Sequence, residues 1–118
     1  MGDQDYIVLL LTTNTPPDLG TENGQRKVVS WFDSKKVQYR QVDAVDDADV
    51  RKELTKISER RGNYPQVFIT DQASETVFIG GFDEIQDLIE MNDLDAAILE
   101  ANPDLKTFDQ VFAKCIKK

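Results

Sequence analysis

The sequence has no histidine and only one cysteine, Cys115. Without histidine the chain cannot build a Ser–His–Asp or Cys–His catalytic group, and it cannot bind zinc through imidazole. A single cysteine also excludes an internal disulfide and a two-cysteine redox pair within one chain. The 118 residues are expected to form one domain, and they contain no pattern that predicts a catalytic residue, a metal site or a cofactor.

Positive charge and long apolar runs are also scarce. The 14 lysine and arginine residues are outnumbered by 22 aspartate and glutamate residues, which gives a net charge of −8. Such a surface does not favour phosphate groups, so no nucleic-acid partner is expected. The longest apolar run, 7–11, is too short to span a membrane, and no basic signal-peptide segment precedes it. We therefore expect a cytoplasmic protein with no membrane partner.

The spacing of apolar residues in the first part of the chain predicts alternating strands and helices. The expected elements are, in order, a strand, a loop, a helix and a strand, over 6–11, 12–24, 25–36 and 37–42. The loop is predicted from its prolines and glycines, and a loop of this length is often functional. These patterns are typical of an α/β protein.

A second helix is expected where Val50, Leu54 and Ile57 fall on one stripe. The arginine pair at 60–61 suits its last turn, because cations are favoured near the C-terminal end of a helix. The aspartates of 43–49 are interpreted as a solvated turn and helix start. They do not match a calcium loop, since the central glycine and final glutamate of an EF-hand are missing.

The second half of the chain predicts a hairpin followed by helices. Strands over 66–69 and 76–79 are close enough in sequence to pair, and helices are expected around 85–89 and over 94–101. A capping-box pattern at Thr107 predicts a further helix.

Cys115 falls on the apolar face of the helix that is predicted to begin at Thr107. The thiol could be reactive, with two nearby lysines lowering its pKa. Burial among phenylalanines is the favoured interpretation, because free cysteine is among the most buried residue types.

The expected order, β-α-β-α-β-β-α with a C-terminal helical extension, is that of the thioredoxin-like fold. The segment Asn63-Tyr-Pro-Gln-Val-Phe-Ile69 resembles the glutaredoxin segment that ends in Thr-Val-Pro-Gln-Val-Phe-Ile. The segment Phe78-Ile-Gly-Gly-Phe-Asp83 resembles the glutaredoxin Gly-Gly-x-Asp-Asp-Leu turn into a helix. The resemblance implies a four-stranded mixed sheet in a glutaredoxin-like domain over 1–91, with 92–118 as a helical extension packed on it.

The loop over 12–24 departs from the glutaredoxin pattern, because it contains no sulfur where glutaredoxins carry Cys-Pro-Tyr-Cys or Cys-Gly-Phe-Ser. Thiol–disulfide exchange needs a thiolate, and serine or threonine cannot replace it. The chain resembles the SH3-domain-binding glutamic-acid-rich proteins, a branch with this fold and without these cysteines. It lacks their Pro-Leu-Pro-Pro segment. We therefore expect no enzyme activity, and a protein-interaction module or adaptor with a protein partner. The alternative is a protein that binds glutathione or a small anion in the remaining groove.

The resemblance also implies a binding groove. Glutaredoxins have a cis proline at the position of Pro65, and the backbone before it, here Tyr64, pairs with an extended peptide, usually glutathione. They hold the γ-glutamyl carboxylate at the helix start that corresponds to Gly81, Phe82 and Asp83, where free N–H groups favour an anion. Asp83 is expected to be the N-cap of that helix.

Three further features complete the expected binding surfaces. Arg61 lies near a position where glutaredoxins contact the glycyl carboxylate. The 12–24 loop is expected to join the groove at the same end of the sheet. Residues 71–104 carry ten acidic side chains and no basic one, so this surface is a second candidate for docking a basic partner.

Overall fold

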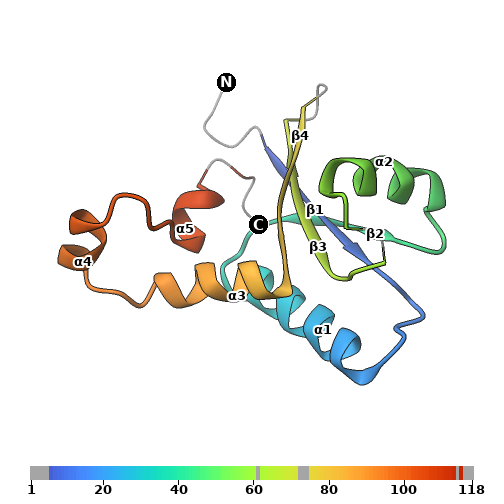
Figure 1. Cartoon of the computed structure of the whole chain (residues 1–118), viewed down its shortest axis with the longest axis horizontal. Helices are drawn as coiled ribbons and strands as arrows, with labels where there is room; N and C mark the ends of the chain where they lie inside the picture. The colour runs from blue at the N-terminus through green and yellow to red at the C-terminus, as the bar shows by residue number, and fades with distance from the viewer. Residues whose placement is uncertain (1–5, 61, 72–74, 114, 116–118) are drawn as a thin grey trace.

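The computed structural model describes residues 6–60, 62–71, 75–113 and 115. Within these ranges four strands form one sheet, in the spatial order β2-β1-β3-β4 (Figure 1). The strands are β1 (Ile7–Thr12), β2 (Tyr39–Asp43), β3 (Gln66–Thr70) and β4 (Thr76–Gly81). The helices are α1 (Leu19–Ser34), α2 (Ala48–Ser58), α3 (Phe82–Met91), α4 (Ala96–Ala101) and α5 (Phe108–Val111).

The sheet is mixed, as the resemblance to glutaredoxins implied. β1 runs parallel to β2 and antiparallel to β3, and β3 forms an antiparallel hairpin with β4. Each strand begins and ends within two residues of its expected range. The pairing places Leu11, Gln66 and Gly81 in one row across three strands. The end of β1, the start of β3 and the end of β4 therefore lie at the same end of the sheet.

Apolar side chains fill both faces of the sheet. On one face Val8 and Leu10 of β1 join a core cluster with residues of α1, α3 and α5. On the other face Leu11 packs with Leu54 of α2 and Phe68 of β3. Figure 1 shows α2 on one side of the sheet and α1 and α3 on the other. β1 is apolar over residues 7–11 because successive side chains enter different cores.

The predicted loop over 12–24 is wrong in its second half, because α1 begins at Leu19. The Asp18 carboxylate caps this helix by accepting a hydrogen bond from the Thr21 backbone N–H at 2.7 Å. That bond lowers the pKa of Asp18 below its ordinary value. Gly20 and Gly24 lie inside the helix, where sequence reasoning had placed a loop. A strong N-cap explains the early start, since it satisfies an otherwise unpaired N–H group.

α2 ends earlier than the sequence predicted. Its last helical residue is Ser58, and Glu59 follows in the left-handed conformation with φ of 59°. Arg60 therefore lies beyond the helix instead of in its last turn, and Arg61 lies outside the described residues. The predicted stripe is only partly buried, because Leu54 enters the core while Val50 and Ile57 are exposed.

Side chains from the C-terminal part of the chain complete the core on the α1 side. The ring of Phe32 on α1 lies 5.4 Å from Phe108 and 5.2 Å from Phe112, between ring centres. Cys115 is 1% exposed and belongs to the same cluster, which agrees with the expectation of burial. The helix itself ends at Val111, so Cys115 lies beyond it and not on its face.

α4 differs from α5 in that none of its residues is buried. It lies beyond the end of α3, away from the sheet (Figure 1). Among the described residues, no helix combines the length and the apolar character needed to cross a membrane.

We expect Phe108→Ala to lower the free energy of unfolding by about 3 kcal/mol, because it removes a fully buried ring from the core. Ile98→Ala on α4 is the matched control, and an exposed position of this kind should change stability by no more than about 0.5 kcal/mol. Urea unfolding followed by circular dichroism measures both. Equal effects of the two substitutions would contradict the placement of α5 in the core and α4 outside it.

Candidate functional site

Five of the predicted site residues line one hollow of about 240 Å³. The hollow lies at the end of the sheet where β3 begins and β4 ends. The peptide bond between Tyr64 and Pro65 is cis, as the resemblance implied. The predicted members are Tyr64, Pro65, Gly81, Phe82 and Asp83, and the further members are Arg60, Asn63 and Glu84. The sixth predicted residue, Arg61, lies outside the described residues.

The N-terminus of α3 is capped differently from the prediction, because Gly81 is the N-cap and Asp83 lies in the first turn. The carboxylate of Glu84 turns back and accepts a hydrogen bond from the Gly81 N–H at 2.6 Å. This is the glutamate half of a capping box, which the spacing of Gly81 and Glu84 could have indicated. Strand β4 extends to Gly81, and the helix follows it directly. The N-cap is therefore two residues earlier in the chain than Asp83, the predicted N-cap.

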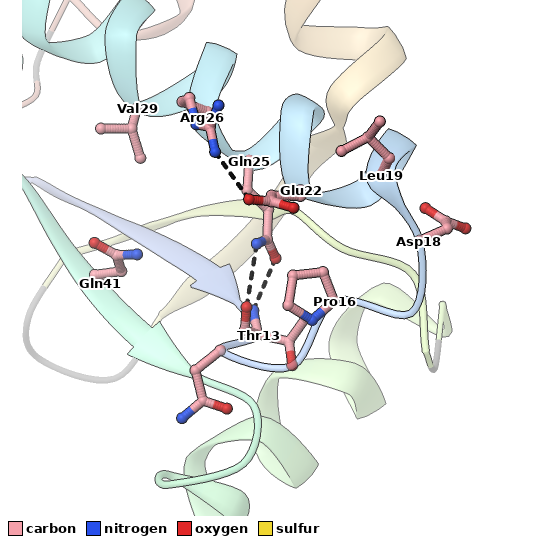
Figure 2. Close-up of a pocket in the computed structure, with 10 residues that line it drawn as sticks. Thr13, Pro16, Asp18, Leu19, Glu22, Gln25, Arg26, Val29 and Gln41 are labelled. Atoms are coloured by element: carbon pink, nitrogen blue, oxygen red, sulfur yellow. Dashed lines mark hydrogen bonds and ion pairs between the residues drawn. The ribbon is translucent and has the colours of Figure 1, made fainter.

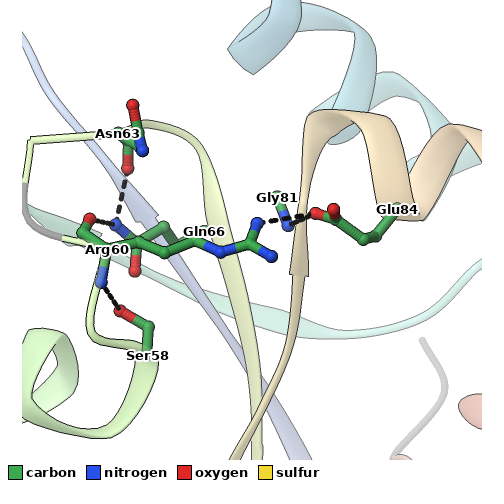
Figure 3. Close-up of polar contacts among 6 residues, drawn as sticks. All are labelled: Ser58, Arg60, Asn63, Gln66, Gly81 and Glu84. Carbon is green, nitrogen blue, oxygen red and sulfur yellow. Dashed lines mark hydrogen bonds and ion pairs between the residues drawn. The ribbon is translucent and has the colours of Figure 1, made fainter.

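Arg60 meets the same carboxylate from the opposite side of the hollow. Its Nη1 donates a hydrogen bond to Glu84 Oε1 at 2.9 Å (Figure 3). This bond is the main reason that the pKa of Glu84 lies below its ordinary value, and partial burial opposes the shift. Sequence reasoning missed both residues. It assigned Arg60 to α2, and only the early end of that helix brings the guanidinium to the hollow.

Gly80 makes this close turn possible. A Cβ at residue 80 would overlap the Cβ of Glu84, which lies next to its backbone and cannot swing away as a flexible side-chain end could. The glycine therefore allows α3 to start directly against the end of β4. The position of the Glu84 carboxylate depends on this contact.

The segment between α2 and β3 is held from beneath by Gln66. Its Nε2 donates hydrogen bonds to the backbone oxygens of Arg60 and Asn63, each at 2.6 Å (Figure 3). Gln66 is fully buried, and its Oε1 has no partner among the described residues. The Arg60 guanidinium also lies 4.9 Å from the ring centre of Phe78, a cation–π distance. These contacts hold Arg60 in place beside Glu84.

Phe82 is only partly exposed, so only part of its ring can contact a ligand. Its ring stacks on Trp31 of α1, with ring centres 5.6 Å apart and planes at 22°. A Cβ at Gly24 would lie 3.5 Å from the Phe82 ring and 3.7 Å from Pro65 Cδ, so α1 packs closely against this end of the site. Phe82 therefore contributes to the packing of α1 on α3 as well as to the wall of the hollow.

The predicted groove is wrong in one respect, because residues of the loop before α1 line a different hollow. That hollow has a volume of about 600 Å³ and shares none of its described lining residues with the first. The Gln25 side chain pairs with both backbone groups of Thr13, accepting from its N–H at 2.8 Å and donating to its oxygen at 3.1 Å (Figure 2). This pairing holds the loop against α1 and explains why it does not join the first hollow.

Neither hollow, among its described lining residues, contains a thiol. Cys115 lines a third hollow of about 220 Å³ with Tyr6, Ile69 and Val111. The described residues hold no cluster of three or more side chains that could bind a metal ion. The first hollow can therefore offer hydrogen bonds from its backbone and a charged rim, but no nucleophile for disulfide exchange.

Comparison with known proteins supports the fold. A glutaredoxin family model matches residues 26–73, which is less than half of the chain. The structure is similar to a buckwheat glutaredoxin solved in complex with glutathione, with a TM-score of 0.54 and 17% sequence identity over 78% of this chain and 76% of that one. The chain has the thioredoxin-like fold.

A second solved structure shows a similar fold. The mature form of 1CGrx1 from Trypanosoma brucei matches with a TM-score of 0.54 and 17% identity, over 88% of this chain and 67% of that one. No curated protein sequence matches the chain. At these identities the likeness concerns the fold and not the activity.

The ion pair between Arg60 and Glu84 predicts a pH-dependent contribution to stability. Because the pKa of Glu84 is lowered in the folded protein, the contribution is fully present above the ordinary value of 4.5 and is lost as the pH falls through the folded value. Glu84→Gln should therefore lower the free energy of unfolding at neutral pH, by no more than about 1 kcal/mol for so exposed a pair. The difference from the wild type should vanish near about pH 2.

Urea unfolding at a series of pH values measures this difference. Asp87→Asn, an equal change of charge on the same helix at an exposed position outside the hollow, is the control. A Glu84→Gln effect that stays constant down to the lowest pH would show that the ion pair does not contribute.

Proposed function

We propose that this chain is a non-catalytic protein-interaction module, or adaptor, that binds an extended peptide segment of a protein partner in the hollow beside Pro65. The observation that carries the proposal is the convergence of the five described candidate residues on one hollow, while the only cysteine is buried elsewhere. Within the described residues the Tyr64 backbone has no hydrogen-bond partner. An extended chain can pair with such a backbone, as in strand addition.

The absence of sulfur from 12–24 supports the non-catalytic part of the proposal. Cys115 could replace the missing thiol only if it reached a substrate, and it is 1% exposed. We place the chain, as part of the same proposal, with the SH3-domain-binding glutamic-acid-rich proteins and in the cytoplasm. Loss of the cysteines does not remove the backbone groups that a peptide would use.

Glutathione or small-anion binding is the second candidate function. It is favoured by the likeness to a glutaredoxin that was solved with glutathione. The Gly81 N–H at the N-terminus of α3 and the Arg60 guanidinium are donors that an anion could use.

The two proposals agree that the protein has no glutathione-dependent disulfide reductase activity. A mixed-disulfide turnover assay should show a rate no higher than that of the buffer, because no exposed thiolate is available. Cys115→Ser is the control. Activity in the wild type that disappears in this variant would contradict the proposal and assign the reaction to Cys115.

Asn63→Trp tests the groove, because Asn63 is exposed and lines the hollow, so the larger side chain should fill it with little effect on folding. Affinity capture from cell extract, read by mass spectrometry, should lose specific partners at least about tenfold, as expected when a central contact is blocked. Asn102→Trp, the same change at an exposed position beyond α4, should capture normally. The thermal midpoints of both variants should stay close to that of the wild type.

Charge reversal at Glu90 and Asp93 tests the rival acidic surface in the same assay. These residues are exposed at the end of α3 and beyond it, and they do not line the hollow. If this reversal abolishes capture while Asn63→Trp captures normally, the acidic surface is the interaction site and the groove proposal is wrong.

A further inference from the structure

The hollow beside Pro65 already contains a carboxylate that belongs to this chain. Glu84 Oε1 accepts from both the Gly81 N–H and the Arg60 guanidinium, at 2.6 and 2.9 Å. These two donors are therefore already paired with a carboxylate of the chain itself. Of the charged side chains described as lining the hollow, Arg60 is positive, while Asp83 and Glu84 are negative. Lys27 lies at its edge, with Nζ 5.9 Å from the ring centre of Phe82. The one described cation of the lining is therefore already paired with a carboxylate, and Asp83 adds a second negative charge beside it.

We propose that Glu84 acts as a built-in ligand that excludes carboxylates, so that the hollow selects a neutral or basic internal segment of a partner peptide. This inference rests on the proposed peptide-binding function and names the class of peptide. A ligand carboxylate has to displace Glu84 from two hydrogen bonds and approach the exposed Asp83. A neutral peptide leaves the pair intact, and a basic side chain gains attraction from Asp83.

The geometry around the pair opposes an alternative arrangement in which Arg60 turns toward a ligand. The guanidinium lies over the Phe78 ring, and Gln66 holds the Arg60 backbone oxygen at 2.6 Å. Gly80 brings the backbone of α3 so close that the Glu84 side chain lies directly against the end of β4. The exclusion therefore depends on one charge at a well-defined position.

Glutathione and its dimethyl ester are suitable probes, because they share a peptide backbone and differ in their two carboxylates. Trp31 is the only tryptophan and stacks on Phe82, which lines the hollow, so its fluorescence can report binding. The wild type should bind the ester about tenfold more tightly than the free acid, as expected when a partly exposed ion pair and a capping bond must be displaced. Backbone amide signals near Tyr64 locate the bound probe.

Glu84→Gln should strengthen binding of the free acid about tenfold and leave ester binding unchanged. Glutamine at this position can still accept the capping hydrogen bond, so the helix start is retained while the charge is removed. Asp87→Asn is the matched control, since it removes the same charge from α3 outside the hollow. This control should bind both probes as the wild type does.

The inference is overturned if the wild type binds the free acid as tightly as the ester, or if Glu84→Gln does not strengthen binding of the acid. It is also overturned if no variant binds the ester at millimolar concentration. The capture assay with Asn63→Trp tests peptide binding in the hollow separately from the exclusion of carboxylates by Glu84. Loss of capture together with tight binding of the acid by the wild type leaves the module function standing without the selectivity. Normal capture by Asn63→Trp removes the hollow as the site of partner binding, whatever the titrations give.

Discussion

Burial of both faces of the central strands constrains the rest of the structure, because alternate side chains of β1 and β3 enter two separate cores. In β1 this requirement makes residues 7–11 apolar, with Val8 and Leu10 on one face and Leu11 on the other. A shift of one residue in register would exchange the two faces, so the pairing of β1 with β3 is strongly specified. The helices then take the positions that cover each face.

The same register builds the candidate site. Leu11, Gln66 and Gly81 form one row, so the proline before β3 and the helix start after β4 meet at one end of the sheet. Gln66 is part of this row and also holds the backbone of the segment that carries Arg60. Buried N–H groups are expensive to leave unpaired, and the Gln66 Nε2 group is satisfied by the backbone oxygens of Arg60 and Asn63, which holds the loop against the start of β3. The site is thus a consequence of sheet geometry more than of any single motif.

The chain lacks a thiol before α1 and holds a carboxylate of its own at the start of α3. The loop before α1 contributes no sulfur, and its backbone is held beside the helix by Gln25. At the other hollow, the start of α3 is occupied by Glu84. Among the residues described as lining the two hollows there is therefore no thiol, and the Gly81 N–H is already bonded to a side chain of the same helix. A shared fold does not by itself carry over the activity of the proteins that share it.

Apolar spacing in the sequence by itself determined the strands and the burial of Cys115. The mixed sheet and five residues of the candidate hollow came from the resemblance to glutaredoxins of two short segments, whose residues lie close together in the chain. Tertiary structure decided the meeting of Arg60 with Glu84, which joins positions 24 residues apart and follows from the end of α2 at Ser58. The early start of α1 rests instead on the local cap from Asp18 to Thr21, which apolar spacing does not reveal. Helix ends and ion pairs differ by only about 1 kcal/mol between alternatives, so apolar spacing alone does not decide them.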